Sequence, residues 1–214
     1  MEHAAAAQNQ AKKKTLEASE RARADIACAR ILWDWLRSRF DTQKLIFLDE
    51  TWLKTNMARV YAWARRGLRA VARVPHGRWH TTTFVAGLRH GRIVAPMLLD
   101  GAMDGAAFQA WVEQSLAPTL HAGDIVAADR LSSHKIDAAR EAIEARGAIL
   151  LFLPGYSPDD NPIEEFFSKL KSVVRRLEPR SDEALTEAVN EALQLVTPDE
   201  CANYLANKGY GQSC

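Results

Sequence analysis

The feature that most constrains the fold is a set of three short runs of apolar residues, two of which end in an aspartate. The runs are LIFLD at 45–49, IVAAD at 125–129 and ILLFLP at 149–154. Continuous apolar runs of about four to six residues are typical of strands that are buried on both faces. Such strands need helices on both sides of their sheet. The runs therefore predict an α/β protein.

The remaining pattern predicts how the other elements are arranged. Apolar segments at 81–88 and 92–100 flank a His-Gly pair, which predicts an antiparallel hairpin. After the hairpin, helical and strand patterns alternate, which indicates parallel pairing in the second half of the sheet. Apolar residues recur at helical spacing at 15–40, 105–120, 135–147, 163–177, 182–196 and 198–205. We expect a mixed sheet flanked by helices, with a helical arm before it and helices after it.

Composition excludes several classes of protein. The 214 residues include 47% hydrophobic and 26% charged ones, as in an ordinary globular chain with one core of roughly 150 residues and peripheral arms. The three cysteines lack the spacing of a zinc module or of a disulfide framework, and a reducing cytosol suits them. No apolar run resembles a membrane span or a signal peptide. We expect a cytoplasmic protein without a membrane partner.

The net charge of +1 conceals a strongly basic stretch. Between Thr51 and Leu99 there is no Asp or Glu, whereas nine Lys and Arg residues and four Trp or Tyr residues occur there. Such a stretch is typical of a surface that binds a polyanion, and a solvated charged face is the alternative. Trp52 is either a base-stacking residue or part of the core. We predict DNA contacts for Lys54, Arg59, Arg65, Arg66, Arg69, Arg73 and Arg78, and for Lys169 and Lys171, for which a solvated helix face is equally consistent.

Three carboxylates occupy positions where a metal site is expected. Asp49 and Asp129 end buried strands, and Glu164 lies in the first turn of the helix after the third apolar run. Ligands of α/β sheets bind beyond the carboxyl ends of strands, and two divalent cations held by oxygen atoms suit phosphodiester chemistry. Two alternatives stay open. Asp100 also ends a strand, and Asn161 with Glu164 has the pattern of a helix capping box.

Five segments between residues 43 and 210 carry motifs that are more specific together than alone. They read LDETW (48–52), HGRWHTTTFVAGLRHG (76–91), DIVAADRLSSHK (124–135), LPGYSPDDNPIEEFFSKLK (153–171) and TPDECANYLANKGY (197–210). Together they resemble the catalytic region of bacterial insertion-sequence transposases related to mariner, the IS six-thirty type of the DDE superfamily. That family has an Asp, Asp, Glu triad with thirty-four residues between its last two members. Here 34 residues separate Asp129 from Glu164.

The resemblance implies a fold and an activity. It implies a ribonuclease H-like five-stranded sheet with Asp49 on the first strand, Asp129 after the fourth and Glu164 on the helix after the fifth, and it demotes Asp100. These three carboxylates would hold two divalent cations, magnesium or manganese. The implied enzyme cleaves DNA at the ends of a mobile element and joins the freed 3′-hydroxyl to target DNA, commonly at a TA step. Two active sites in one synapse imply a homodimer.

Other positions extend the resemblance or depart from it. His134 and Asn161 match positions that would orient a metal ligand or contact phosphate, with an ordinary histidine at a helix start as an equal alternative for His134. Arg130 stands where the family usually has Asn, and Gly155 where it usually has Pro. These departures leave open a catalytically decayed remnant that only binds DNA or another transposase. A different ribonuclease H-like nuclease is the other alternative.

The resemblance also implies a division of the chain. We expect a helical arm at 1–42, a catalytic core at 43–178 and a helical extension at 179–214. Full-length relatives begin with helix-turn-helix modules that bind DNA, and residues 1–40 lack the pattern of a recognition helix. A separate chain that carries such a module is therefore one candidate partner. The expected location is the bacterial nucleoid.

Overall fold

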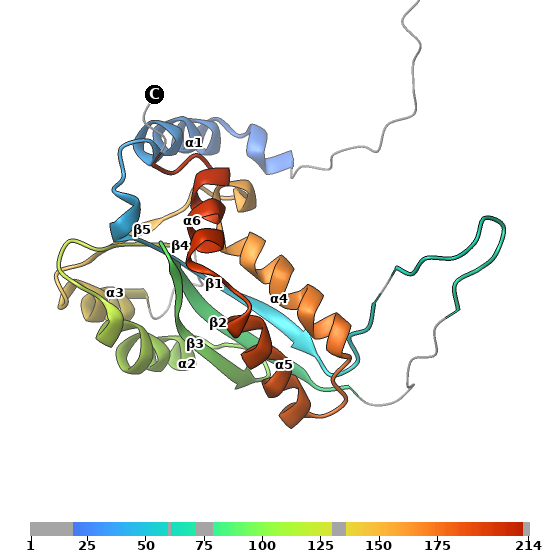
Figure 1. Cartoon of the computed structure of the whole chain (residues 1–214). Coiled ribbons are helices and arrows are strands. Elements are labelled where there is room, and N and C mark those ends of the chain that lie inside the picture. Colours follow the sequence, from blue (N-terminus) through green and yellow to red (C-terminus); the bar gives the residue numbers. More distant parts are fainter. Residues whose placement is uncertain (1–18, 60, 72–78, 130–135, 212–214) are drawn as a thin grey trace, which may run out of the picture.

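A central five-stranded sheet organises the chain (Figure 1). The computed structural model describes residues 19–59, 61–71, 79–129 and 136–211. The strand order is β3-β2-β1-β4-β5; the first three strands pair antiparallel, and β4 and β5 run parallel to β1. The strands are β1 (Leu45–Lys54), β2 (Thr81–Arg89), β3 (Arg92–Asp100), β4 (Ile125–Ala128) and β5 (Ile149–Phe152). The predicted mixed sheet is confirmed.

Helices cover both faces of this sheet. Side chains alternate along a strand, so Leu45 and Phe47 pack against α4, α5 and α6, whereas Ile46 and Leu48 pack against α2 and α3. Both faces of β1 are therefore apolar, which accounts for its continuous apolar run. The α-helices are α1 (Ala24–Arg37), α2 (Gly105–Trp111), α3 (Ile136–Glu144), α4 (Ile163–Leu177), α5 (Asp182–Gln194) and α6 (Pro198–Asn207).

The helical arm and the C-terminal helices belong to the same hydrophobic cluster as α4. Trp33 of α1, Leu185 of α5 and Leu205 of α6 are all buried in it. The short 3-10 helix Ser19–Ala22 precedes α1. None of the helices in the described parts of the chain is long and apolar enough to cross a membrane.

Two elements differ from their predicted form. The stretch at 105–120 is not one α-helix, because α2 continues as a π-helical turn (Val112–Leu116) and a 3-10 turn (Ala117–Thr119). Strand β1 does not end at Asp49 but continues to Lys54. Its last six residues pair only with β2, since the pairing of β1 with β4 ends where Leu48 lies beside Ala128.

Candidate active site

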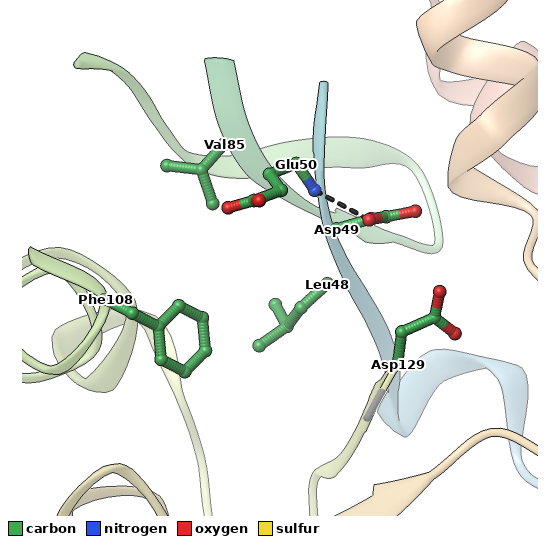
Figure 2. A pocket seen from close by; sticks show the side chains of 6 residues that line it. All are labelled: Leu48, Asp49, Glu50, Val85, Phe108 and Asp129. Atoms are coloured by element: carbon green, nitrogen blue, oxygen red, sulfur yellow. Dashed lines mark hydrogen bonds between the residues drawn. The ribbon is translucent and has the colours of Figure 1, made fainter. Parts of the chain in front are cut away.

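The end of β4 places two of the predicted carboxylates next to each other. Leu48 and Ala128 are neighbours in the parallel register, so Asp49 and Asp129 follow at the same level of the sheet. Both side chains point to one side of the sheet, whereas Glu50 points to the other side, toward Val85 (Figure 2). The two aspartates therefore lie on the face of the sheet that α4 covers.

Two hydrogen bonds hold the Asp49 carboxylate. The backbone N–H of Glu50 donates to Oδ1 at 2.7 Å, and the side-chain amide of Asn161 donates from Nδ2 to Oδ2 at 2.9 Å. Asn161 is only 1% exposed, and it directly precedes Pro162 at the start of α4. The turn before α4 thus fixes the orientation of a carboxylate on β1.

The alternative role of Asn161 as a helix cap is wrong. Helix α4 begins at Ile163, its N-cap is Pro162, and no side chain caps it. Within the described residues, Glu164 makes no hydrogen bond to the backbone of Asn161, so the predicted capping box is absent. Glu164 is exposed in the first turn of α4. Its carboxylate is therefore not committed to capping.

Negative charge is concentrated at this site. The pKa of Asp49 is raised from 3.8 to about 7, mainly by burial; the hydrogen bond from the N–H of Glu50 lowers it, and the negative charges of Asp129 and Glu164 add to the rise. Desolvation also raises the pKa of Asp129. Carboxylate oxygens are the ligands that magnesium and manganese prefer, and a bound cation would offset the repulsion among these groups. The donor set therefore fits a divalent cation.

The three carboxylates do not form a closed cage. No three His, Cys, Asp or Glu side chains in the described parts of the chain come close enough together to hold a metal ion. Asp49 and Asp129 line one open cleft together, whereas Glu164 acts on Asp49 through its charge. The structure thus brings the three predicted carboxylates into one region, but it does not bring them close enough together to bind one cation jointly.

The cleft combines this acidic centre with cations. Trp52 of β1 lines the cleft and is 63% exposed. The alternative that places it in the core is therefore wrong. Lysine and arginine side chains from β1 and α4 line the same cleft. Its lining residues are Asp49, Glu50, Thr51, Trp52, Lys54, Met57, Asp129, Lys171 and Arg175.

Comparison with known proteins identifies the family. The family model described as DDE superfamily endonuclease matches residues 44–186, more than half of the chain. This chain belongs to the DDE endonuclease superfamily. No protein with a curated description matches the sequence.

Solved structures of a mariner transposase share the fold of this DDE chain. The Mos1 strand transfer complex aligns with a TM-score of 0.72 at 18% identity, over 94% of this chain and 62% of that chain. The mariner Mos1 paired end complex with Mg gives 0.73 at 18% identity, over 94% and 63%. The isolated catalytic domain of Mos1 mariner transposase gives 0.63 at 13% identity, over 92% of both chains. The predicted ribonuclease H-like fold is thus confirmed, and the chain spans about three fifths of the transposase in those complexes.

One cation of the DDE cleft was not among the predicted DNA contacts. Arg175 follows Lys171 by four residues and Glu164 by eleven, which places all three on one face of α4. This helical spacing could have identified Arg175 as a cleft residue from the sequence. Lys169 differs from Lys171, because its Nζ contacts both carboxylate oxygens of Glu200 and the backbone oxygen of residue 195, each at 2.6 Å. Lys169 therefore ties α4 to α6 rather than facing the cleft.

Cations of the basic stretch lie in different environments. The loop between β1 and β2 projects from the body of the molecule in Figure 1, and its described cations Arg59, Arg65, Arg66 and Arg69 are exposed. Arg89 is instead 8% exposed and forms an ion pair with the buried Asp124. The remaining predicted positions Arg73, Arg78 and His134, together with Arg130, lie outside the described residues.

Asp100 takes no part in the cleft. It lies at the end of β3, two strands from β1, and its carboxylate pairs with the ring Nε2 of His80 at 3.0 Å. The other ring nitrogen of His80 lies 3.0 Å from Asp182 at the start of α5. Asp100 thus anchors the base of the β1–β2 loop.

Proposed function

We propose that this chain is the catalytic domain of a DNA transposase, which uses two divalent cations to cleave DNA strands and transfer them to target DNA. The observation that carries the proposal is the pairing of Asp49 with Asp129 at the end of β4, in a cleft with cations on its rim. Mos1 complexes have been solved with Mg and with Mn, which supports magnesium or manganese as the cofactor.

Each group of the cleft has a role in this proposal. Asp49, Asp129 and Glu164 would hold the cations, which would supply Lewis acidity to phosphodiester chemistry. Asn161 keeps one oxygen of Asp49 in place through its 2.9 Å hydrogen bond. Lys171 and the other cleft cations neutralise DNA phosphates, whose contacts position the strand without reading its sequence.

The proposal extends to partners and origin. The exposed loop cations Arg59, Arg65, Arg66 and Arg69 continue the DNA track beyond the cleft. The DNA would be the ends of a mobile element and a target, with a TA step as the preferred target site. The Mos1 relatives are named as paired-end and strand transfer complexes, which supports a homodimer in a synapse. The motif set supports an origin in a bacterial insertion sequence.

A calorimetric titration of manganese tests the catalytic proposal. The chain is mixed with a short nonspecific duplex whose phosphates complete the coordination, and Asp129→Asn is titrated in parallel. Asp100→Asn is the matched control, because it removes a strand-terminal carboxylate outside the cleft. We expect binding by the wild type and by the control, and at least tenfold weaker binding by Asp129→Asn. No binding by any of the three would overturn the metal site and favour the decayed remnant.

A further inference from the structure

Helix α1 contacts the turn that carries Asn161. Arg30 pairs with Asp159 at 2.7 Å and with the second oxygen of Asp160 at 3.2 Å, and Arg37 donates to the first oxygen of Asp160 at 3.1 Å. Asp160 is 2% exposed. A carboxylate this deeply buried needs charged partners, and α1 supplies both of them.

A second, uncharged chain of hydrogen bonds joins α1 to the same residue. The indole N–H of Trp33 donates to the hydroxyl of Tyr210 at 2.8 Å, and that hydroxyl donates to the backbone oxygen of Asp160 at 2.7 Å. Trp33 and Tyr210 are both buried. Helix α1 therefore restrains the side chain and the backbone of Asp160 at once.

The position of Asp160 decides where the next side chain points. Asn161 follows Asp160 directly, and its Nδ2 donates to Asp49. The other amide atom, Oδ1, is buried and has no hydrogen-bond partner among the residues that the structure describes. The amide of Asn161 therefore lacks a second anchor of its own, and its alignment with Asp49 depends on the backbone of the turn.

We propose that Asn161 is a positioning residue for Asp49, and that α1 holds Asn161 in position through Arg30, Arg37 and Asp160. Displacement of α1 would then disorganise a metal ligand on β1 without touching it. The consequence for metal binding rests on the function proposed above. The positioning itself is independent of any metal, so the two proposals fail separately.

Solution NMR of the metal-free chain tests the positioning directly. The side-chain NH₂ group of Asn161 is buried and hydrogen-bonded, so its protons exchange slowly with water. In Arg30→Gln/Arg37→Gln we expect this exchange to be about tenfold faster, because the turn loses its three ion pairs with these two arginines. Arg23→Gln is the matched control, since Arg23 pairs with Asp25 near the start of α1. It should leave the exchange unchanged.

Manganese affinity provides the second measurement. Asn161→Leu keeps the approximate size of the side chain and removes its donor without adding a charge or a metal ligand, so we expect roughly tenfold weaker binding, as for other groups that orient a metal ligand. Arg30→Gln/Arg37→Gln should weaken binding to a similar degree. The triple variant should bind no more weakly than Asn161→Leu, because all three side chains act through one hydrogen bond.

The possible results separate the two proposals. If the double variant melts at a lower temperature but the Asn161 amide stays protected, α1 only stabilises the fold and the positioning proposal is wrong. If the double variant does not fold, the single variant Arg37→Gln, which keeps Arg30, is used instead. Faster exchange of its Asn161 amide would support the positioning proposal, and unchanged exchange would contradict it. If the wild type binds no manganese, the proposed function fails, while the exchange of the Asn161 amide still decides the positioning.

Discussion

Replacing Asp49 by asparagine should stabilise the metal-free chain at neutral and higher pH. The pKa of Asp49 in the folded protein is about 7, against 3.8 for an ordinary aspartate. A difference of about three units corresponds to roughly 4 kcal/mol in favour of the neutral carboxyl. The folded state thus binds this proton more tightly than the unfolded state does. Its contribution to stability is complete below about pH 4 and is lost as the pH rises toward 7.

The substitution keeps the hydrogen bonds around Asp49. Its new amide oxygen can accept the N–H of Glu50, as Oδ1 does now. Its new NH₂ group can donate to Oδ1 of Asn161 once that amide has turned over, and this oxygen has no partner in the present structure. The neutral side chain therefore avoids the cost of desolvating a charge and adds no unpaired polar atom, because Nδ2 of the turned Asn161 amide takes the place of the Oδ1 that lacks a partner among the described residues of the wild type. Because Asp49 keeps some contact with solvent, we expect a net gain of about 2–4 kcal/mol.

Urea unfolding in the presence of a chelator measures this gain. The difference in the free energy of unfolding between Asp49→Asn and the wild type should be near zero at pH 4 and should reach its full size by pH 8. Asp100→Asn is the control, because Asp100 is exposed at the end of β3. Its difference should stay within about 1 kcal/mol at both pH values, because the ion pair that it removes with His80 is exposed to solvent. A less stable Asp49→Asn protein at pH 8, or a difference that does not change with pH, would refute the reasoning.

Three further substitutions test other parts of the structure. Arg89→Ala removes the partner of Asp124, which is 4% exposed, and should lower the free energy of unfolding by about 3–5 kcal/mol in urea titrations. Phe167→Ala removes a buried ring that packs against Phe84 and should lower it by a similar 3–5 kcal/mol, measured in the same way. Arg65→Glu should leave stability within about 0.5 kcal/mol and weaken the binding of nonspecific duplex at low salt. Unchanged affinity would exclude the β1–β2 loop from the DNA track.

Elements with clear periodicity and clear ends were predictable from the sequence. Helix α4 occupies the predicted 163–177, because its apolar stripe repeats at helical spacing after a turn rich in Pro and Asp. Strand β3 occupies the predicted 92–100, because His90-Gly91 marks the hairpin. The last residues of β1 were not predictable in this way. They read DETWLK, which is neither a continuous apolar run nor a strict alternation, and beyond Leu48 the strand has a neighbour on one side only.

Contacts between distant residues were harder to predict than elements. The string around Asn161 fits a helix cap, and only the fold brings its amide to Asp49, 112 residues earlier. Arg89 belongs to the basic stretch by sequence, but its partner Asp124 lies 35 residues later and draws it into the interior. The family resemblance gave the positions of the acidic residues. The resemblance did not predict the hydrogen bonds and ion pairs that orient these acidic residues, because such contacts depend on the individual side chains of this chain.

The raised pKa of Asp49 links the stability of this fold to cation binding. Near pH 8 the folded chain carries a desolvated carboxylate close to two other negative charges, and this lowers its stability. A cation bound there would offset the repulsion and stabilise the fold according to its concentration and affinity. Near pH 5 a proton occupies the same carboxyl and competes with the cation. The ion pairs of α1 with Asp160 do not depend on the cation, so they can hold the turn in place while the carboxylates repel each other. Support from α1 is thus most important when no cation is bound.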